Sequence, residues 1–460
     1  SIQFLAANQG PKVCELEGPT AILNISKTDI NFSIGWYKYS LVFIHLKMKF
    51  ICFLYALVGF CFATFAQTDA RLLEKLMLQK PAQFGEILAH PNQYRLQILY
   101  TQIDRDKNNI PHFKEYSYHL NPKEYFYPAS TVKMPLAFLA LEKINNLKIK
   151  GLSKSTQMVY DSVADRQETI YNNPYAQNGT QNIEQAIKEI FLVSDNNAAN
   201  RLFEFVTPHT VHEALAAKGY KDVYIRNRLE LGRTAKENRS TQSIYFYDDK
   251  GKIIYHQPAA INKDSLPYYN AFIGEGYMNN QDSLIKGPLN FSEKNRIYLS
   301  DLTHILRSVI FYDQTPSTQR FNLTPADRKF LLHWMHTLPT ESQYPTYDTA
   351  NYWPSFCKFL YTGSEKGPFP SQLKIFNKVG DAYGFLLDIA YIIDPEKKVE
   401  FMLSAVIYCN SDGILNDSKY DYDTIGFPFY KNLGQLIYNY EVQRKKAFLP
   451  NFDTLLKDAQ

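Results

Sequence analysis

Cysteine is scarce in this chain of 460 residues, with five copies in all. Cys14, Cys52 and Cys61 lie in or before an apolar leader, so Cys357 and Cys409 are the two that remain beyond it. Two cysteines make neither a disulfide framework nor a zinc knuckle. One bridge between Cys357 and Cys409 is compatible with an oxidising compartment, and the sequence does not decide whether it forms.

Other functional signals are missing as well. No long run of Lys or Arg occurs and the net charge is only +4, so nucleic acid is not an expected partner. No phosphate-binding glycine loop, no His-Glu-x-x-His sequence and no internal repeat is present. The pairs His209/His212 and His333/His336 have i, i+3 spacing but no third ligand, so we expect no metal and no cofactor.

Apolar residues are plentiful, but their longest run is short. Hydrophobic residues make up 45% of the chain, which is ample for two or three domains. Met48-Lys49 precedes an apolar run of about 16 residues that ends before Ala66, whereas a membrane span needs roughly 20. This pattern predicts a signal peptide at 48–66, cleavage near Ala66 and export to the periplasm or medium. Residues 1–47 are expected to lie upstream of the true start.

Hydrophobic spacing predicts helices at both ends of the chain and through its middle, with strands near each end. The expected helices are 69–79, a buried helix from Ser130, 182–193, 198–206, 207–218, 302–311, 324–337 and 427–442. The expected strands are 94–103 and 112–119, a hairpin at 243–247 and 252–256 inside an insertion at 241–299, and a meander at 373–379, 384–393 and 399–408.

The segment from Tyr127 to Leu136 places Ser130 and Lys133 three residues apart at the start of the buried helix. This spacing puts both side chains on one helical face. A serine hydroxyl needs a base to become a nucleophile, and a desolvated lysine with a lowered pKa supplies one. The same pattern recurs at three further places, so it is not decisive alone: Ser283/Lys286, Ser355/Lys358 and Ser371/Lys374.

Two further motifs follow in the chain and occur once each. Ser194-Asp195-Asn196 stands between two expected helices, and Lys378-Val379-Gly380 ends an expected strand. Read singly, the first is a helix cap and the second a strand end. Together with Ser130 and Lys133, they resemble the motif set of penicillin-recognising serine enzymes. Over most of residues 69–445 the chain resembles class A serine β-lactamases of the penicillin-binding-protein-like superfamily.

The resemblance implies an α+β fold of the β-lactamase/transpeptidase type, an α/β sandwich with an antiparallel sheet plus an all-α domain. The sandwich would be built from 67–129 and 345–460, and the helical domain from 130–344. It also implies site roles. Ser130 would be the nucleophile, Lys133 and Ser194 would carry protons, and Glu230 would activate water. Asn196 and Lys378 would bind substrate, Gly380 would let it approach the strand, and the Asp381 backbone N–H would complete an oxyanion hole with that of Ser130.

Departures from the family pattern concern the substrate more than the fold. Val379 stands where the family usually carries Thr or Ser, whose hydroxyl helps to bind the substrate carboxylate. After Glu230 comes Leu231-Gly232-Arg233-Thr234 in place of the usual Pro and Asn, and Glu237 is a substitute candidate for the base. Arg228 is expected to anchor the Glu230 loop by pairing with a carboxylate.

Three functions are compatible with these residues. The first is a periplasmic or secreted serine β-lactamase. The second is a D-Ala-D-Ala peptidase acting on peptidoglycan, and the third is a catalytically silent peptidoglycan-binding scaffold. We expect a small-molecule β-lactam or peptidoglycan peptide as ligand, no stable membrane span in the mature protein, and a monomer.

Overall fold

The structure is a computed structural model that describes residues 71–162 and 167–460. All described residues belong to one compact unit, Asp69–Gln460. The expected signal peptide at 48–66 and the segment 1–47 lie outside the described residues. Within the described part, no helix is both long and apolar enough to cross a bilayer.

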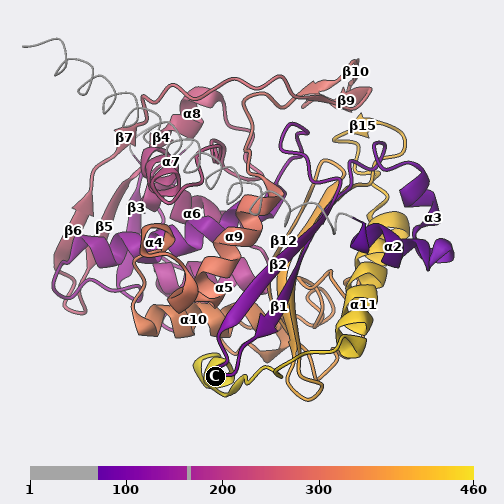
Figure 1. The fold of residues 1–460 in the computed structure, drawn as a ribbon. Coiled ribbons are helices and arrows are strands. Elements are labelled where there is room, and N and C mark those ends of the chain that lie inside the picture. The colour runs from indigo at the N-terminus through magenta and orange to yellow at the C-terminus, as the bar shows by residue number, and fades with distance from the viewer. Residues whose placement is uncertain (1–70, 163–166) are drawn as a thin grey trace, which may run out of the picture. The chain divides into compact units, whose positions relative to one another are not determined.

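An antiparallel sheet of five strands forms the centre of this unit, in the order β12-β13-β14-β1-β2 (Figure 1). Its strands are β1 (Gln97–Arg105), β2 (Pro111–Tyr118), β12 (Lys374–Ala382), β13 (Phe385–Asp394) and β14 (Val399–Tyr408). β1 pairs with β14, so the two ends of the described chain meet in one sheet. β13 and β14 are buried along their whole length, because both faces of the sheet are covered.

Side-chain alternation divides the core into two apolar clusters, one on each face of the sheet. On β14, Phe401 and Leu403 enter one cluster, while Met402 and Val406 enter the other. The first cluster is completed by α2 (Leu72–Leu78), α3 (Pro81–Ala89) and α11 (Phe427–Gln443) (Figure 1). The second is shared with α9 (Leu299–Ile310), α10 (Pro325–His336) and the helices between the two sequence halves of the sheet.

The middle of the chain is largely helical. Its helices are α4 (Lys133–Leu147), α5 (Ile183–Leu192), α6 (Asn196–Val206), α7 (Pro208–Ala217) and α8 (Ala235–Arg239). α4 is buried on nearly every side, as its apolar sequence predicts. Asn182 caps α5 by accepting from the Gln185 backbone N at 2.7 Å, and Asp195 caps α6 in the same way.

Short strands attach the insertion to the rest of the unit. The expected hairpin is β5 (Ser243–Tyr247) with β6 (Ile253–Gln257), and it pairs with β3 (Gln157–Asp161). A second small sheet joins β9 (Gly276–Met278) and β10 (Leu284–Lys286) to β15 (Ile414–Leu415), far along the chain (Figure 1). Two-stranded pairs are β4 (Ser240–Thr241) with β7 (Ala260–Ile261), and β8 (Phe272–Ile273) with β11 (Leu289–Asn290).

The prediction of an α+β fold with an antiparallel sheet is confirmed. The sequence did not predict α3, β3 or the closing helix α12 (Asp453–Asp458), and it did not predict the pairing of β9 with β15. Short 3-10 helices lie at Ala129–Val132, Tyr312–Gln314, Ser317–Gln319 and Pro339–Glu341, and a π-helical turn at Tyr422–Gly426 precedes α11. Cys357 and Cys409 are both buried and free, so the open question of a bridge is answered in the negative. The division into two domains at 129/130 and 344/345 stays a prediction.

Candidate active site

Ser130 stands where β12 of the central sheet meets the start of α4. It belongs to the 3-10 helix Ala129–Val132, which runs directly into α4. Gly380 of β12 packs against this turn, and a Cβ at that position would lie 2.9 Å from the backbone N of Ser130 and 3.1 Å from the carbonyl O of Pro128. A side chain there would push the strand away from the serine. The structure thus gives Gly380 a packing reason in addition to the predicted one.

Lys133 lies on the first turn of α4 and is 0% exposed. Its Nζ donates to the carbonyl O of Ser194 and to Oδ1 of Asn196 at 2.6 Å, and Oγ of Ser194 lies 3.3 Å away. Burial lowers the pKa of Lys133 well below its ordinary value, and the charge of Lys378 lowers it further.

Lys378 approaches the same serine from the sheet. Its Nζ donates to Oγ of Ser194 at 2.7 Å and to the carbonyl O of Val379 at 2.8 Å. Burial lowers the pKa of Lys378 to about 8. Two amines, one from α4 and one from β12, therefore converge on the Ser194 hydroxyl.

The Ser194-Asp195-Asn196 segment both caps a helix and contacts the two lysines. Asp195 is a helix cap, because its Oδ1 accepts from the backbone N of Ala198 at 2.7 Å. Ser194, with a φ of +59°, carries its side chain to the two lysines instead. The tight turn before α6 allows neighbouring residues to cap the helix and to serve the site.

Glu230 extends this network toward solvent. It is exposed, has a φ of +62°, and its Oε2 accepts from Nδ2 of Asn196 at 2.6 Å. Asn196 thereby links Glu230 to Lys133. Glu237, the substitute candidate, caps α8 by accepting from the backbone N of Thr234 at 2.7 Å.

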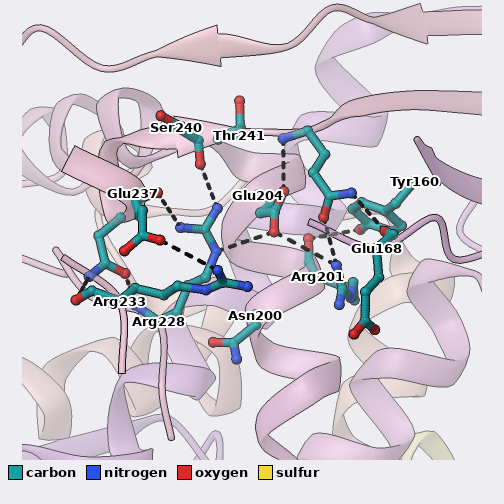
Figure 2. Close-up of polar contacts among 12 residues, drawn as sticks. Tyr160, Glu168, Asn200, Arg201, Glu204, Arg228, Arg233, Glu237, Ser240 and Thr241 are labelled. Atoms are coloured by element: carbon teal, nitrogen blue, oxygen red, sulfur yellow. Dashed lines mark hydrogen bonds and ion pairs between the residues drawn. The ribbon is translucent and has the colours of Figure 1, made fainter. Parts of the chain in front are cut away.

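The loop that carries Glu230 is fixed by the buried guanidinium of Arg228 (Figure 2). Its Nε donates to Oε1 of Glu204 on α6 at 3.2 Å. Its terminal nitrogens donate to the carbonyl oxygens of Glu237 at 3.0 Å and Ser240 at 2.6 Å. Glu204 also lies 3.7 Å from Arg201. The pairing expected of Arg228 is present, and Figure 2 shows it joining α6 to the segment that leads into the insertion.

Two cavities meet at Ser130, Asn196 and Asp381, which line both of them. The first measures about 630 Å³ and the second about 820 Å³. The first is walled by aromatic and charged residues that include Trp353, Phe356, Phe427, Glu365, Lys366 and Asp423. The second is walled by the Glu230 loop and by insertion residues that include Met278, Asn279, Asp282 and Lys294.

Asp381 follows Gly380 on β12 and is exposed. Desolvation by the surrounding protein raises the pKa of the Asp381 carboxylate, while the charges of Lys133 and Lys378 oppose the rise. Its backbone N–H and that of Ser130 lie on the two elements that Gly380 holds in contact. These two N–H groups are therefore the candidates for an oxyanion hole.

Comparison with known proteins gives one family match. Residues 85–252 match the model of the beta-lactamase enzyme family. No curated protein sequence matches the chain.

Among solved structures, the chain is similar to three β-lactamases at low identity. One from Xanthomonas campestris is 16% identical, over 81% of this chain and 98% of that chain, with a TM-score of 0.46. One from Sphaerobacter thermophilus is 10% identical, over 80% and 99%, with a TM-score of 0.44. A class A β-lactamase from Mycobacterium abscessus is 12% identical, over 77% and 98%, also with a TM-score of 0.44.

The segment that matches this family model contains five of the predicted site residues: Ser130, Lys133, Ser194, Asn196 and Glu230. The predicted substrate-binding residues Lys378, Gly380 and Asp381 lie beyond it on β12. The fold brings them to the same place, because β12 packs against the 3-10 helix that carries Ser130. Local sequence could not show this contact across some 250 positions.

The remaining candidates have structural partners. Lys358 donates to Oδ1 of Asn377 at 2.6 Å and to the carbonyl O of Met335 at 2.8 Å. Ser283 and Ser371 lie in exposed turns. His209 contacts Asp264 at 2.9 Å, His212 lies 3.1 Å from the carbonyl O of Ile225, and His333 and His336 each lie 3.1 Å from that of Ala459. Within the described ranges no group of metal-ligating side chains is found.

Sequence reasoning missed the wall of the first cavity. Trp353, Phe356 and Asp423 come from irregular or π-helical segments that carry no recognisable motif. The one available signal was the aromatic cluster Tyr352-Trp353 beside Phe356, in a region that periodicity left unassigned.

Proposed function

We propose that this protein is a serine hydrolase that opens the amide bond of β-lactams through an acyl-enzyme on Ser130. The observation that carries the proposal is the convergence of the buried amines of Lys133 and Lys378 on Ser194, beside a serine that faces two cavities. A structural role alone would not require buried amines with lowered pKa values next to an accessible hydroxyl.

Lys133 is proposed to accept the proton of the Ser130 hydroxyl. A neutral amine keeps two hydrogens, which suffice for the Ser194 carbonyl and the Asn196 amide oxygen, and its lone pair remains available. The lowered pKa of Lys133 favours this neutral form. Ser130 Oγ then bonds to the substrate carbonyl carbon, and the backbone N–H groups of Ser130 and Asp381 stabilise the oxyanion.

Ser194 is proposed to pass the proton on to the leaving nitrogen as the carbon–nitrogen bond breaks. It is suited to this relay because its Oγ lies near both lysines, at 3.3 Å from Lys133 and 2.7 Å from Lys378. Lys378 also supplies positive charge for a substrate carboxylate. No metal or cofactor takes part in this scheme.

Glu230 is proposed to remove a proton from the water that cleaves the acyl-enzyme. Its side chain is exposed beside the second cavity and is held by Asn196, so a water between Glu230 and the Ser130 ester has room to bind. The overall reaction consumes one water and gives a single ring-opened product that carries both the new carboxylic acid and the new amine.

The test is incubation with a penicillin and a chromogenic cephalosporin, followed by intact-mass measurement and turnover. We expect a transient adduct on Ser130, loss of the adduct in Ser130→Ala, and normal labelling in the matched control Ser355→Ala. A stable adduct without turnover would favour the D-Ala-D-Ala peptidase function, and a peptide ending in D-Ala-D-Ala should then be cleaved. No adduct from penicillin, peptide or fluorophosphonate would favour the silent scaffold.

Export from a signal peptide that begins at Met48 is part of the same proposal, since β-lactams and peptidoglycan are met outside the cytoplasm. N-terminal sequencing of the exported protein should find a start near Gln67. A start before Met48 would contradict it.

A further inference from the structure

Asp381 places an unpaired carboxylate beside the proposed nucleophile. It is exposed, it follows Gly380 on β12, and it lines both cavities that meet at Ser130. Among the described residues, none donates a hydrogen bond to this carboxylate, and its electrostatic neighbours are the amines of Lys133 and Lys378. Both amines are already engaged by Ser194.

Farther from Ser130, the first cavity is lined by further acidic side chains and by aromatic side chains. Asp423 adds a second exposed carboxylate to its lining. The third, Glu365, is neutralised by Lys431 at 2.6 Å. Trp353, Phe356 and Phe427 form an aromatic wall, and aromatic faces attract organic cations. The Nζ of Lys366, which also lines the cavity, already lies 4.9 Å from the centre of the Trp353 ring.

An anionic group would find less support in this cavity. Val379 offers no hydroxyl, and its side chain is only 2% exposed. Lys378 uses hydrogens on Ser194 and on the carbonyl O of Val379.

We propose that the first cavity receives an alkylammonium group of the acyl donor, and that Asp381 makes the site prefer cationic over anionic substrates. The inference rests on the proposed acylation of Ser130 and names the substrate class of that site. Asp381 acts here as a specificity residue through its side chain, while its backbone N–H keeps the role proposed above.

The test compares two activated esters of equal length. One is the para-nitrophenyl ester of an ω-amino acid, and the other is the mono-para-nitrophenyl ester of the corresponding dicarboxylic acid. The parent should hydrolyse the cationic ester with the higher kcat/KM. Asp381→Asn should lower the cationic-to-anionic ratio about tenfold, because one nearby charge acts in opposite directions on the two esters. High salt should reduce the parent's preference.

Asp249→Asn is the matched control, since it removes the same charge from an exposed residue in the β5–β6 turn. It should leave the ratio unchanged. Asp423→Asn should lower the ratio by a smaller factor than Asp381→Asn.

A binding measurement separates this inference from the proposed chemistry. In Ser130→Ala, hexylammonium should give a saturation-transfer NMR signal that Asp381→Asn weakens severalfold, whereas hexanoate should give little signal. Hexylammonium binding without ester turnover by the parent would overturn the acylation proposal and support the cation cavity. Equal binding of both ions, or an ester ratio that Asp381→Asn does not change, would overturn the inference about Asp381 while leaving Ser130 in place.

Discussion

Two Ser-x-x-Lys segments of this chain bury their lysines to the same extent but differ in the solvent access of their serines. Lys133 and Lys358 are 0% and 1% exposed, and burial lowers the pKa of both, that of Lys358 to about 8. Ser130 is half-buried and lines two cavities. Ser355 is buried, and its hydroxyl donates to the carbonyl O of Glu365.

The surroundings of the two lysines explain the difference. Lys133 contacts the side chains of Ser194 and Asn196, and both residues line the first cavity. Lys358 contacts Asn377, whose amide also donates to Oδ1 of the buried Asp388 at 2.8 Å. The lesson is that a buried amine with a lowered pKa does not by itself mark a catalytic base. An accessible hydroxyl next to it is also required.

The largest expected effect on acylation comes from removing the Lys133 side chain, and removing Lys358 provides the comparison. Lys133→Ala should slow acylation of Ser130 by on the order of 10²–10⁴, the usual range for a positioned acid–base group. Stopped-flow mixing with a penicillin, read by intact mass, measures the rate.

Lys358→Ala is the matched control for that experiment. It should acylate at nearly the parental rate but unfold at lower urea concentration. It leaves the buried Asn377 and the Met335 carbonyl without a donor, which costs about 1–3 kcal/mol. Equal losses of acylation in both variants would show that the two segments do not differ in function.

The second prediction is that the carboxylates of Glu230 and Glu237 differ in their effect on deacylation. Glu230→Gln should still acylate but should hydrolyse the adduct a hundredfold or more slowly, because an amide cannot take the proton of water. Accumulation of the adduct over time measures the effect.

Glu237→Gln should turn over nearly normally, because Glu237 is engaged in the cap of α8. Deacylation that is slowed in Glu237→Gln and unchanged in Glu230→Gln would reverse the assignment.

The third prediction concerns the carboxylate of the substrate. Val379→Thr should raise kcat/KM on penicillins, since a hydrogen bond to a charged group contributes about 1.5–3 kcal/mol. Steady-state kinetics would measure it, and the neutral fluorophosphonate should label both proteins at equal rates. Unchanged or lower efficiency would indicate that the site recognises something other than a carboxylate.

The smallest expected effect is a pH dependence that distinguishes the role of Lys133 from that of Lys378. Lys133 must be neutral to act as a base, so acylation should fall as the pH drops through its lowered pKa. Lys378 must be charged to attract an anion, so acylation by a penicillin should also fall severalfold as the pH rises through about 8. With a neutral ester, the acylation rate should fall at low pH but not at high pH. An alkaline fall of equal size for the neutral ester would exclude this role of Lys378.

Local sequence predicted most of the fold that positions the site. The alternation in 399–408 and the helical spacing in 427–442 were sufficient to find β14 and α11, because one period recurs across each segment. Local sequence did not predict α3, whose short pattern lies between two other elements. It also did not predict β3, whose partner strand begins more than 80 positions later. A pairing partner at that distance leaves no local trace.

By itself, the sequence determined which side chains could do the chemistry: Ser130, Lys133, Ser194, Asn196 and Lys378 stand in three motifs whose residue types and order carry meaning. Only the tertiary structure decided which of four similar serine–lysine pairs faces a cavity, and that Asp381, Asp423 and Trp353 share that cavity with Ser130. Residue type is a local property of the chain. Solvent access and charge proximity depend instead on how the sheet packs against α4 and on where irregular segments come to lie, and these contacts join residues hundreds of positions apart.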